Sequence, residues 1–67
     1  MKVIWTNNGR AILLKKFDMA TDDIDCTNLA KMGAVAVIGK TWRLRQSGII
    51  FVCSKVDDVT LVIVTVQ

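Results

Sequence analysis

The sequence predicts one small α+β domain, residues 1–67, with the element order β-α-α-β-β-β. We expect an antiparallel sheet of three or four strands, with two short helices packed on one of its faces. The main observation lies in residues 40–67, where three β-rich segments are separated by a Ser-Gly pair at 47–48 and an Asp pair at 57–58. Segments joined by such short turns pair as sequential antiparallel strands. A strand-like segment at the start of the chain and two stretches of helix-forming residues after it complete the pattern.

A turn signal at residues 7–9 separates the first predicted strand from the first predicted helix. Residues 2–6 are mostly β-branched or aromatic, which is typical of a strand, and the Asn-Asn-Gly run at 7–9 ends it. We expect Asn8 to cap the next helix, because its side-chain oxygen can accept from the unpaired N–H groups of the first turn. Residues 10–17 are rich in good helix formers, so the first helix is predicted there.

The second helix is predicted to begin at Thr21 and to end near Lys31. Thr21 is a suitable N-cap, and three aspartates follow it where the helix dipole favours negative charge. The alternative for this acidic cluster is a cation site, but its spacing matches no EF-hand loop. Gly33 is expected to end the helix in the left-handed conformation.

Four strands are predicted in the rest of the chain, at about 35–38, 42–46, 49–56 and 59–66. The last of them is apolar on both faces, which indicates a central strand rather than an edge strand. The predicted core residues come from both helices and from two strands: Leu13, Phe17, Leu29, Leu44 and Ile63.

Composition restricts the classes of function. Hydrophobic residues make up 52% of the chain, so a partner or a second copy is expected to cover part of the apolar surface. A net charge of +3 suits RNA or an acidic host protein. Cys26 and Cys53 are expected to be buried, reduced thiols of a cytoplasmic protein, with no disulfide and no metal. No segment approaches the ~20 apolar residues that span a bilayer, and no cofactor is expected.

Two arginines are the leading candidates for a binding site. Strand alternation places Arg43 and Arg45 on one side of their strand and Trp42 and Leu44 on the other. Guanidinium groups suit phosphate or carboxylate, although exposed charges on a strand also serve solubility alone. Lysines from other elements are expected to flank them, and Trp42 either stacks on a base or joins the core. The predicted binding set is Arg43, Arg45, Lys15, Lys16, Lys55 and Trp42.

Parts of this pattern resemble a known toxin family. Residues 2–6 precede a helix with paired lysines, and residues 39–66 carry strand arginines ahead of an acidic hairpin turn; both features resemble RelE/ParE-type toxins. The middle of the chain is more similar to smaller relatives in the barnase–colicin–RelE group of ribonuclease folds. The resemblance implies that Thr65 and either Arg43 or Arg45 belong to the site. The helix histidine of the smaller relatives and the C-terminal Tyr or Arg of many RelE-type enzymes are absent, which implies a degenerate catalytic site.

Three functions stay open. The first is a small cytosolic binding module with a toxin-like fold and no catalysis, whose basic sheet face binds RNA or an acidic host protein, as expected of a phage or mobile-element inhibitor of host machinery. The second is a metal-independent ribonuclease in which Arg43, Arg45, Lys16 and Thr65 stabilise charge, because the chain has no histidine and no tyrosine. The third is a structural module that forms a homo-oligomer through an apolar strand or face. We expect the first, because the arginines are present while histidine and tyrosine are lacking, so acid–base help would have to come from Lys or Asp at a cost in rate.

Overall fold

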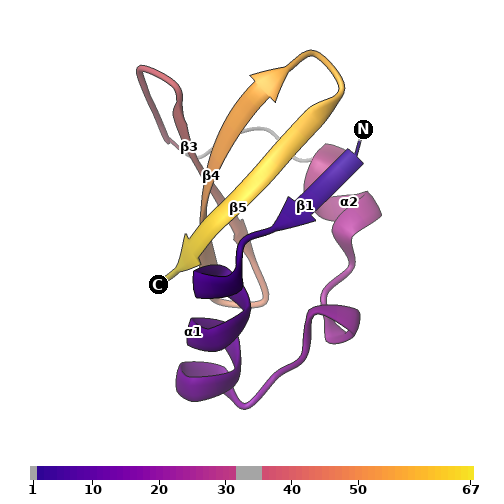
Figure 1. Cartoon of the computed structure of the whole chain (residues 1–67), viewed down its shortest axis with the longest axis vertical. Helices are drawn as coiled ribbons and strands as arrows, with labels where there is room; N and C mark the ends of the chain where they lie inside the picture. Colours follow the sequence, from indigo (N-terminus) through magenta and orange to yellow (C-terminus); the bar gives the residue numbers. More distant parts are fainter. Residues whose placement is uncertain (1, 32–35) are drawn as a thin grey trace.

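The computed structural model of the chain describes residues 2–31 and 36–67 and has an α+β architecture (Figure 1). Five strands and two α-helices, with a short 3-10 helix between the helices, follow one another along the chain. In order they are β1 (Lys2–Trp5), α1 (Asn7–Phe17), the 3-10 helix η1 (Thr21–Asp23), α2 (Cys26–Lys31), β2 (Ala36–Ile38), β3 (Thr41–Gln46), β4 (Ile49–Asp57) and β5 (Thr60–Val66).

The strands form one mixed sheet in the order β1-β5-β4-β3-β2. The predicted meander is confirmed, since β2, β3, β4 and β5 pair antiparallel in sequence. The prediction of a wholly antiparallel sheet of three or four strands is wrong, because β1 adds a fifth strand parallel to β5. This pairing joins Trp5 to Ile63 across most of the chain, and no local signal in the sequence specifies it. It also makes β5 a central strand, as predicted.

The β3–β4 turn falls where the Ser-Gly pair predicted it. Gln46 pairs with Ile49, so the connection has only two residues, Ser47 and Gly48, with φ of 53° and 78°. Positive φ at both positions gives the turn a twist that matches that of the flanking strands. In the next hairpin, the Asp57 carboxylate accepts a hydrogen bond of 2.8 Å from the backbone N–H of Val59. This bond, supported by contacts with Thr60, lowers the pKa of Asp57.

The first helix begins earlier than predicted, and Thr6 rather than Asn8 caps it. The Gly9 N–H donates to Thr6 Oγ1 at 2.9 Å, and Thr6 has the extended backbone typical of an N-cap. Asn8 instead lies within the first turn and donates from Nδ2 to the Val64 carbonyl at 3.3 Å. The helix ends at Asp18, which has φ of 53° and donates its N–H to the Leu14 carbonyl.

The predicted second helix is divided into η1 and α2. The cause lies in two aspartates whose side chains bind nearby backbone groups, which competes with a continuous helix. Asp23 accepts from the Ala20 N–H at 2.8 Å, and Asp25 accepts from the Asn28 N–H at 3.0 Å. The α-helix therefore begins only at Cys26. The predicted helix end at Gly33 and the predicted first residue of the strand at 35–38 lie outside the described residues.

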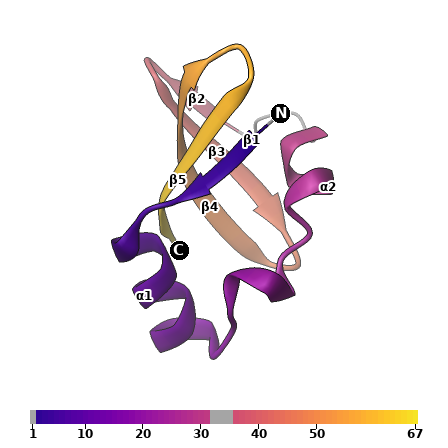
Figure 2. The same ribbon diagram turned by 45° about the vertical axis from the view of Figure 1, so that its right-hand side comes forward.

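One core joins both helices to the sheet. Leu13 of α1 and Leu29 of α2 are fully buried in the same cluster as Leu44, Phe51 and Ile63. Four of the five predicted core residues are therefore confirmed. The fifth, Phe17, is half-buried at the edge of the cluster because it closes the last turn of α1. Figure 2 shows α1 near the lower end of β5 and α2 to the right, where it contacts β1 and β3.

Candidate functional site

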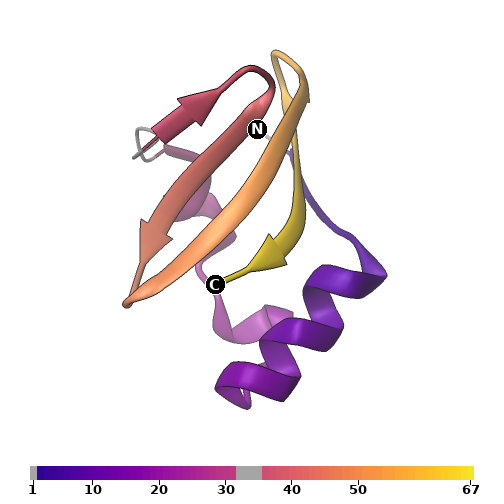
Figure 3. The ribbon, with the colours of Figure 1, turned by 90° about the vertical axis from the view of Figure 1, so that its left-hand side faces the viewer.

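The face of the sheet that points away from the core is the candidate site, and we call it the outer face. Leu44, Phe51 and Ile63 point inward, so strand alternation directs their neighbours on β3, β4 and β5 outward. In Figure 3, β3 and β4 lie in front with α2 behind them, and no described helix covers the strands from this side. The residues of the outer face used below are Ile4, Arg43, Arg45, Ile50, Val52, Val62, Val64 and Thr65.

The strand register brings Arg43 into line with Thr65. Arg43 on β3 pairs with Val52 on β4, and Val52 pairs with Thr65 on β5. Neighbouring strands are about 4.8 Å apart, so the backbones of Arg43 and Thr65 are roughly 10 Å apart across the face. Arg45 pairs with Ile50 in the next outward row. The two arginines thus lie beside the apolar side chains of β4.

A β-bulge in β5 sets the position of Thr65. Val52 pairs with Thr65 while Cys53 pairs with Ile63, so Val64 has no partner on β4. Without this extra residue, Thr65 would point to the same side as buried Ile63. The carbonyl of Val64 accepts from Asn8 Nδ2 and from the Thr6 hydroxyl, so the start of α1 holds the bulge in place.

Apolar side chains occupy the outer face from β4, which adjoins the arginines, across β5 to β1. Ile4 is 39% exposed and Val64 is 40% exposed. Ile50, Val52 and Val62 are half-buried by their neighbours within the sheet. The sequence reasoning did not include these residues in the site. The signal that could have revealed them is the apolar character of both faces of β5.

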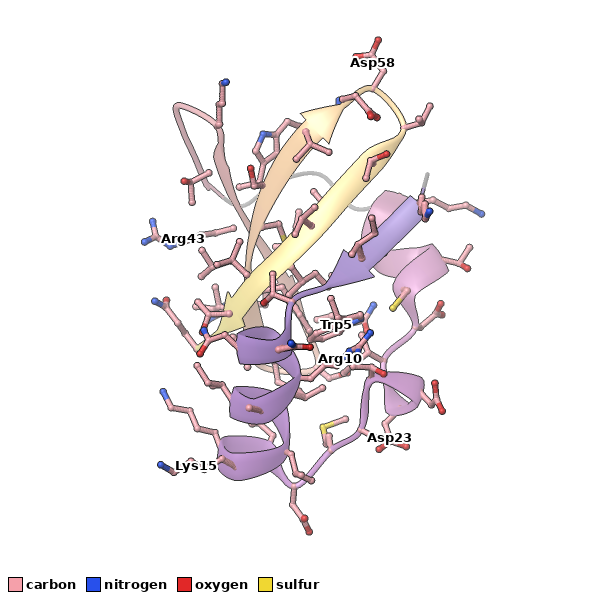
Figure 4. The ribbon with its side chains drawn as sticks, in the orientation of Figure 1. Trp5, Arg10, Lys15, Asp23, Arg43 and Asp58 are labelled. Carbon is pink, nitrogen blue, oxygen red and sulfur yellow. The ribbon has the colours of Figure 1, made fainter. Side chains whose placement is uncertain are left out.

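The structure divides the predicted binding set between different surfaces. Arg43 lies on the outer face as predicted, and Lys15 of α1 points to the same side of the molecule (Figure 4). Lys16 is exposed on α1 one residue further on. Lys55 and Trp42 belong to the opposite side of the sheet, where the Lys55 ammonium lies 5.2 Å from the centre of the Trp42 ring. The expected place of Lys55 beside the arginines is therefore contradicted, because Lys55 lies an odd number of residues from outward Val52 on β4. Trp42 lies opposite the arginines, as alternation along β3 predicted.

The two tryptophans have structural surroundings. Trp5 is buried in the core, and its ring meets that of Phe51 edge to face with centroids 6.0 Å apart. Trp42 is half-buried and packs against the core from beneath Lys55. The outer face therefore has no aromatic side chain among the residues that the structure describes.

The chemistry available on the outer face is anion binding and burial of apolar groups. Burial raises the pKa of the Cys53 thiol to about 12, so this cysteine is not a nucleophile at neutral pH. Cys53 is buried as predicted, but the prediction of a buried thiol is wrong for Cys26, which is half-buried at the start of α2. Within residues 2–31 and 36–67, no group of three or more metal-ligating side chains comes together, and no helix is both long and apolar enough to cross a membrane.

No known family model matches this chain, and no curated protein or solved structure is significantly similar to it. The resemblance to RelE/ParE-type toxins therefore stays a prediction.

Proposed function

We propose that this chain is a non-catalytic module that binds a macromolecule through its outer face. The observation that carries the proposal is a sheet that the described helices cover on one side only, with Arg43 and Arg45 on the other side and exposed Ile4 and Val64 further across the same face. Apolar side chains that a monomer leaves exposed together are typical of an interaction site. Free thiols at Cys26 and Cys53 suit a reducing compartment, so we place the module in the cytoplasm.

The absence of histidine and tyrosine supports binding over catalysis. The chain contains no histidine, and the outward row of Arg43, Val52 and Thr65 offers a cation and a hydroxyl without a base. General acid–base help contributes typically 10²–10⁴-fold to a rate. Arginines alone stabilise negative charge, which is sufficient for binding an anionic partner.

The test is an arginine double variant with a matched control. Arg43→Ala/Arg45→Ala removes two charges from the outer face, while Lys31→Ala/Lys55→Ala removes two charges from other surfaces. We expect the first variant to lose capture of RNA or protein from a lysate and the second to retain it. Circular dichroism would verify that both variants fold. Equal capture by the wild type and the arginine variant would place the binding surface elsewhere.

A second candidate is a ribonuclease of the RelE or barnase–colicin–RelE type. The observation that favours it is the alignment of Arg43 with Thr65, the two residue types that the resemblance implies for the site. Purified protein would be incubated with total RNA and with ribosome-bound message. Cleavage that disappears in Arg43→Ala/Arg45→Ala and weakens in Thr65→Ala would replace the binding module with an enzyme. No cleavage, together with retained binding, would exclude it.

A further inference from the structure

The distribution of charge restricts the chemical class of partner that can bind to the outer face. Figure 4 shows Arg43 and Lys15 pointing to one side of the molecule and Asp23 to the other. Asp58 lies at the tip of the β4–β5 hairpin, away from Arg43. The residues labelled on the side that bears the outer face are cations, whereas the other side carries Arg10 together with Asp23. A partner that docks there is favoured by carboxylates or phosphates, which would meet these cations.

The apolar side chains of the outer face favour a protein partner, which carries carboxylates, over a nucleic acid, which carries phosphates. Ile4 and Val64 are each about two-fifths exposed. Half-buried Val62 pairs with Ile4 and lies two residues before Val64 on β5. A nucleic acid that bound only through phosphates would leave these side chains in water. A protein segment with its own apolar side chains would bury them, which is favourable because it removes apolar surface from water.

The lack of aromatic side chains among the described residues of the outer face also favours a protein over RNA as the partner. Single-stranded RNA is usually held by stacking its bases on aromatic rings, together with a basic groove. Among the described residues of the outer face there is no such ring, and the Trp42 ring lies on the other side beneath Lys55. The outer face therefore offers β-branched side chains where an RNA-binding sheet would offer platforms.

We propose that the occupant of the outer face is an acidic amphipathic helix of a partner protein. Its apolar stripe packs on Val62 and Val64, and carboxylates along one flank pair with Arg43 and Arg45. Such a helix gives the sheet a second covered face and produces a three-layer α/β/α arrangement. The molecule is 20 Å across its shorter dimensions, so roughly 13 residues at 1.5 Å each span it. This inference rests on the proposed binding function and specifies its partner.

A peptide library tests the inference with a defined probe. Peptides of about 16 residues would carry apolar side chains at helical spacing, with Glu, Lys, Gln and Ser randomised elsewhere. Selection on the immobilised chain should enrich Glu over Lys on one flank. Selected peptides should bind Arg43→Gln/Arg45→Gln at least tenfold more weakly than the wild type, and binding should weaken with salt. The control Lys31→Gln/Lys55→Gln should bind as the wild type does.

A second pair of variants tests the apolar contact. Val64→Gln changes the outer face, while Val59→Gln changes an exposed valine at the hairpin tip. We expect only Val64→Gln to weaken the selected peptides. Peptides without Glu enrichment, or with unchanged affinity for the arginine or Val64 variants, would overturn the inference.

Three further outcomes would show that the outer face binds RNA, a second copy of the chain, or neither peptide nor RNA. RNA oligonucleotides that bind more tightly than any selected peptide, with the same arginine dependence, would overturn the acidic helix and leave the binding function standing. A dimer in light scattering that Val64→Gln dissociates would make a second copy the occupant and also overturn it. A monomer that binds neither peptide nor RNA would overturn both proposals.

Discussion

Replacing Ile63 with alanine should remove a large part of the stability of this domain. Ile63 is fully buried on the central strand β5, in the cluster that includes Leu13 and Phe51. The substitution deletes three carbon atoms, which at about 0.8 kcal/mol each gives a transfer loss of about 2.4 kcal/mol. The cavity adds to this loss, so we expect a total of about 3–4 kcal/mol. Domains of this size have only about 3–10 kcal/mol in all.

Urea unfolding followed by tryptophan fluorescence is a suitable assay, because Trp5 is buried against Phe51. The midpoint should fall while the dependence on urea stays constant, as expected when only stability changes. Val64→Ala is the matched control, since Val64 is the next residue on β5 and is 40% exposed. It should cost less than about 1 kcal/mol. A loss below about 1 kcal/mol for Ile63→Ala, or equal losses for both variants, would refute the central position of β5.

Three other predictions concern the turns, the helix start and the thiols. Gly9→Ala should destabilise the fold by about 1–2 kcal/mol in thermal unfolding, despite the better helix propensity of alanine, because the new Cβ would lie 3.0 Å from the Ile63 carbonyl oxygen; a rise in Tm would show that α1 has room to move. The pKa of Asp57 is lowered in the fold, so its contribution to stability should be present at neutral pH and lost as pH falls through that lowered pKa; wild type and Asp57→Ala should therefore differ in Tm at neutral pH and converge in acid, and a constant difference would contradict the hydrogen bond. A thiol reagent should label Cys26 faster than Cys53 in the native protein, because burial raises the pKa of Cys53 to about 12, and the difference should vanish in urea. Equal labelling rates in the native protein would refute this.

The sequence predicted those parts of the site that depend on neighbouring residues and missed those that depend on the tertiary structure. That Arg43 and Arg45 lie opposite Leu44 follows from alternation along one short strand, and the structure confirms it. The alignment of Arg43 with Thr65 depends on the bulge at Val64, and no residue pattern in β5 predicts that bulge. The predicted grouping of Lys55 with the arginines failed because it assumed which side of β4 this lysine would occupy.

The sequence by itself determined the features that depend on neighbouring residues. The Ser-Gly and Asp-Asp pairs located the two hairpin turns, and helix-forming residues located α1 to within three residues at its start. These signals are local because backbone conformation and short-range pairing respond to adjacent side chains. Even here, the competition of Asp23 and Asp25 for backbone N–H groups divided a helix that propensity predicted as continuous.

The tertiary structure alone decided how the ends of the chain meet. The parallel pairing of β1 with β5 joins residues nearly sixty positions apart and is stabilised by packing α1 and α2 on the same core. It also decided which side of the sheet stays open and that Thr65 faces it. Hydrophobic burial has no direction along the sequence, so a strand that is apolar on both faces does not specify which face the helices cover. That choice follows from the close contact of Gly9 with Ile63 and the bonds from Thr6 and Asn8 to β5, which exist only once the chain is folded.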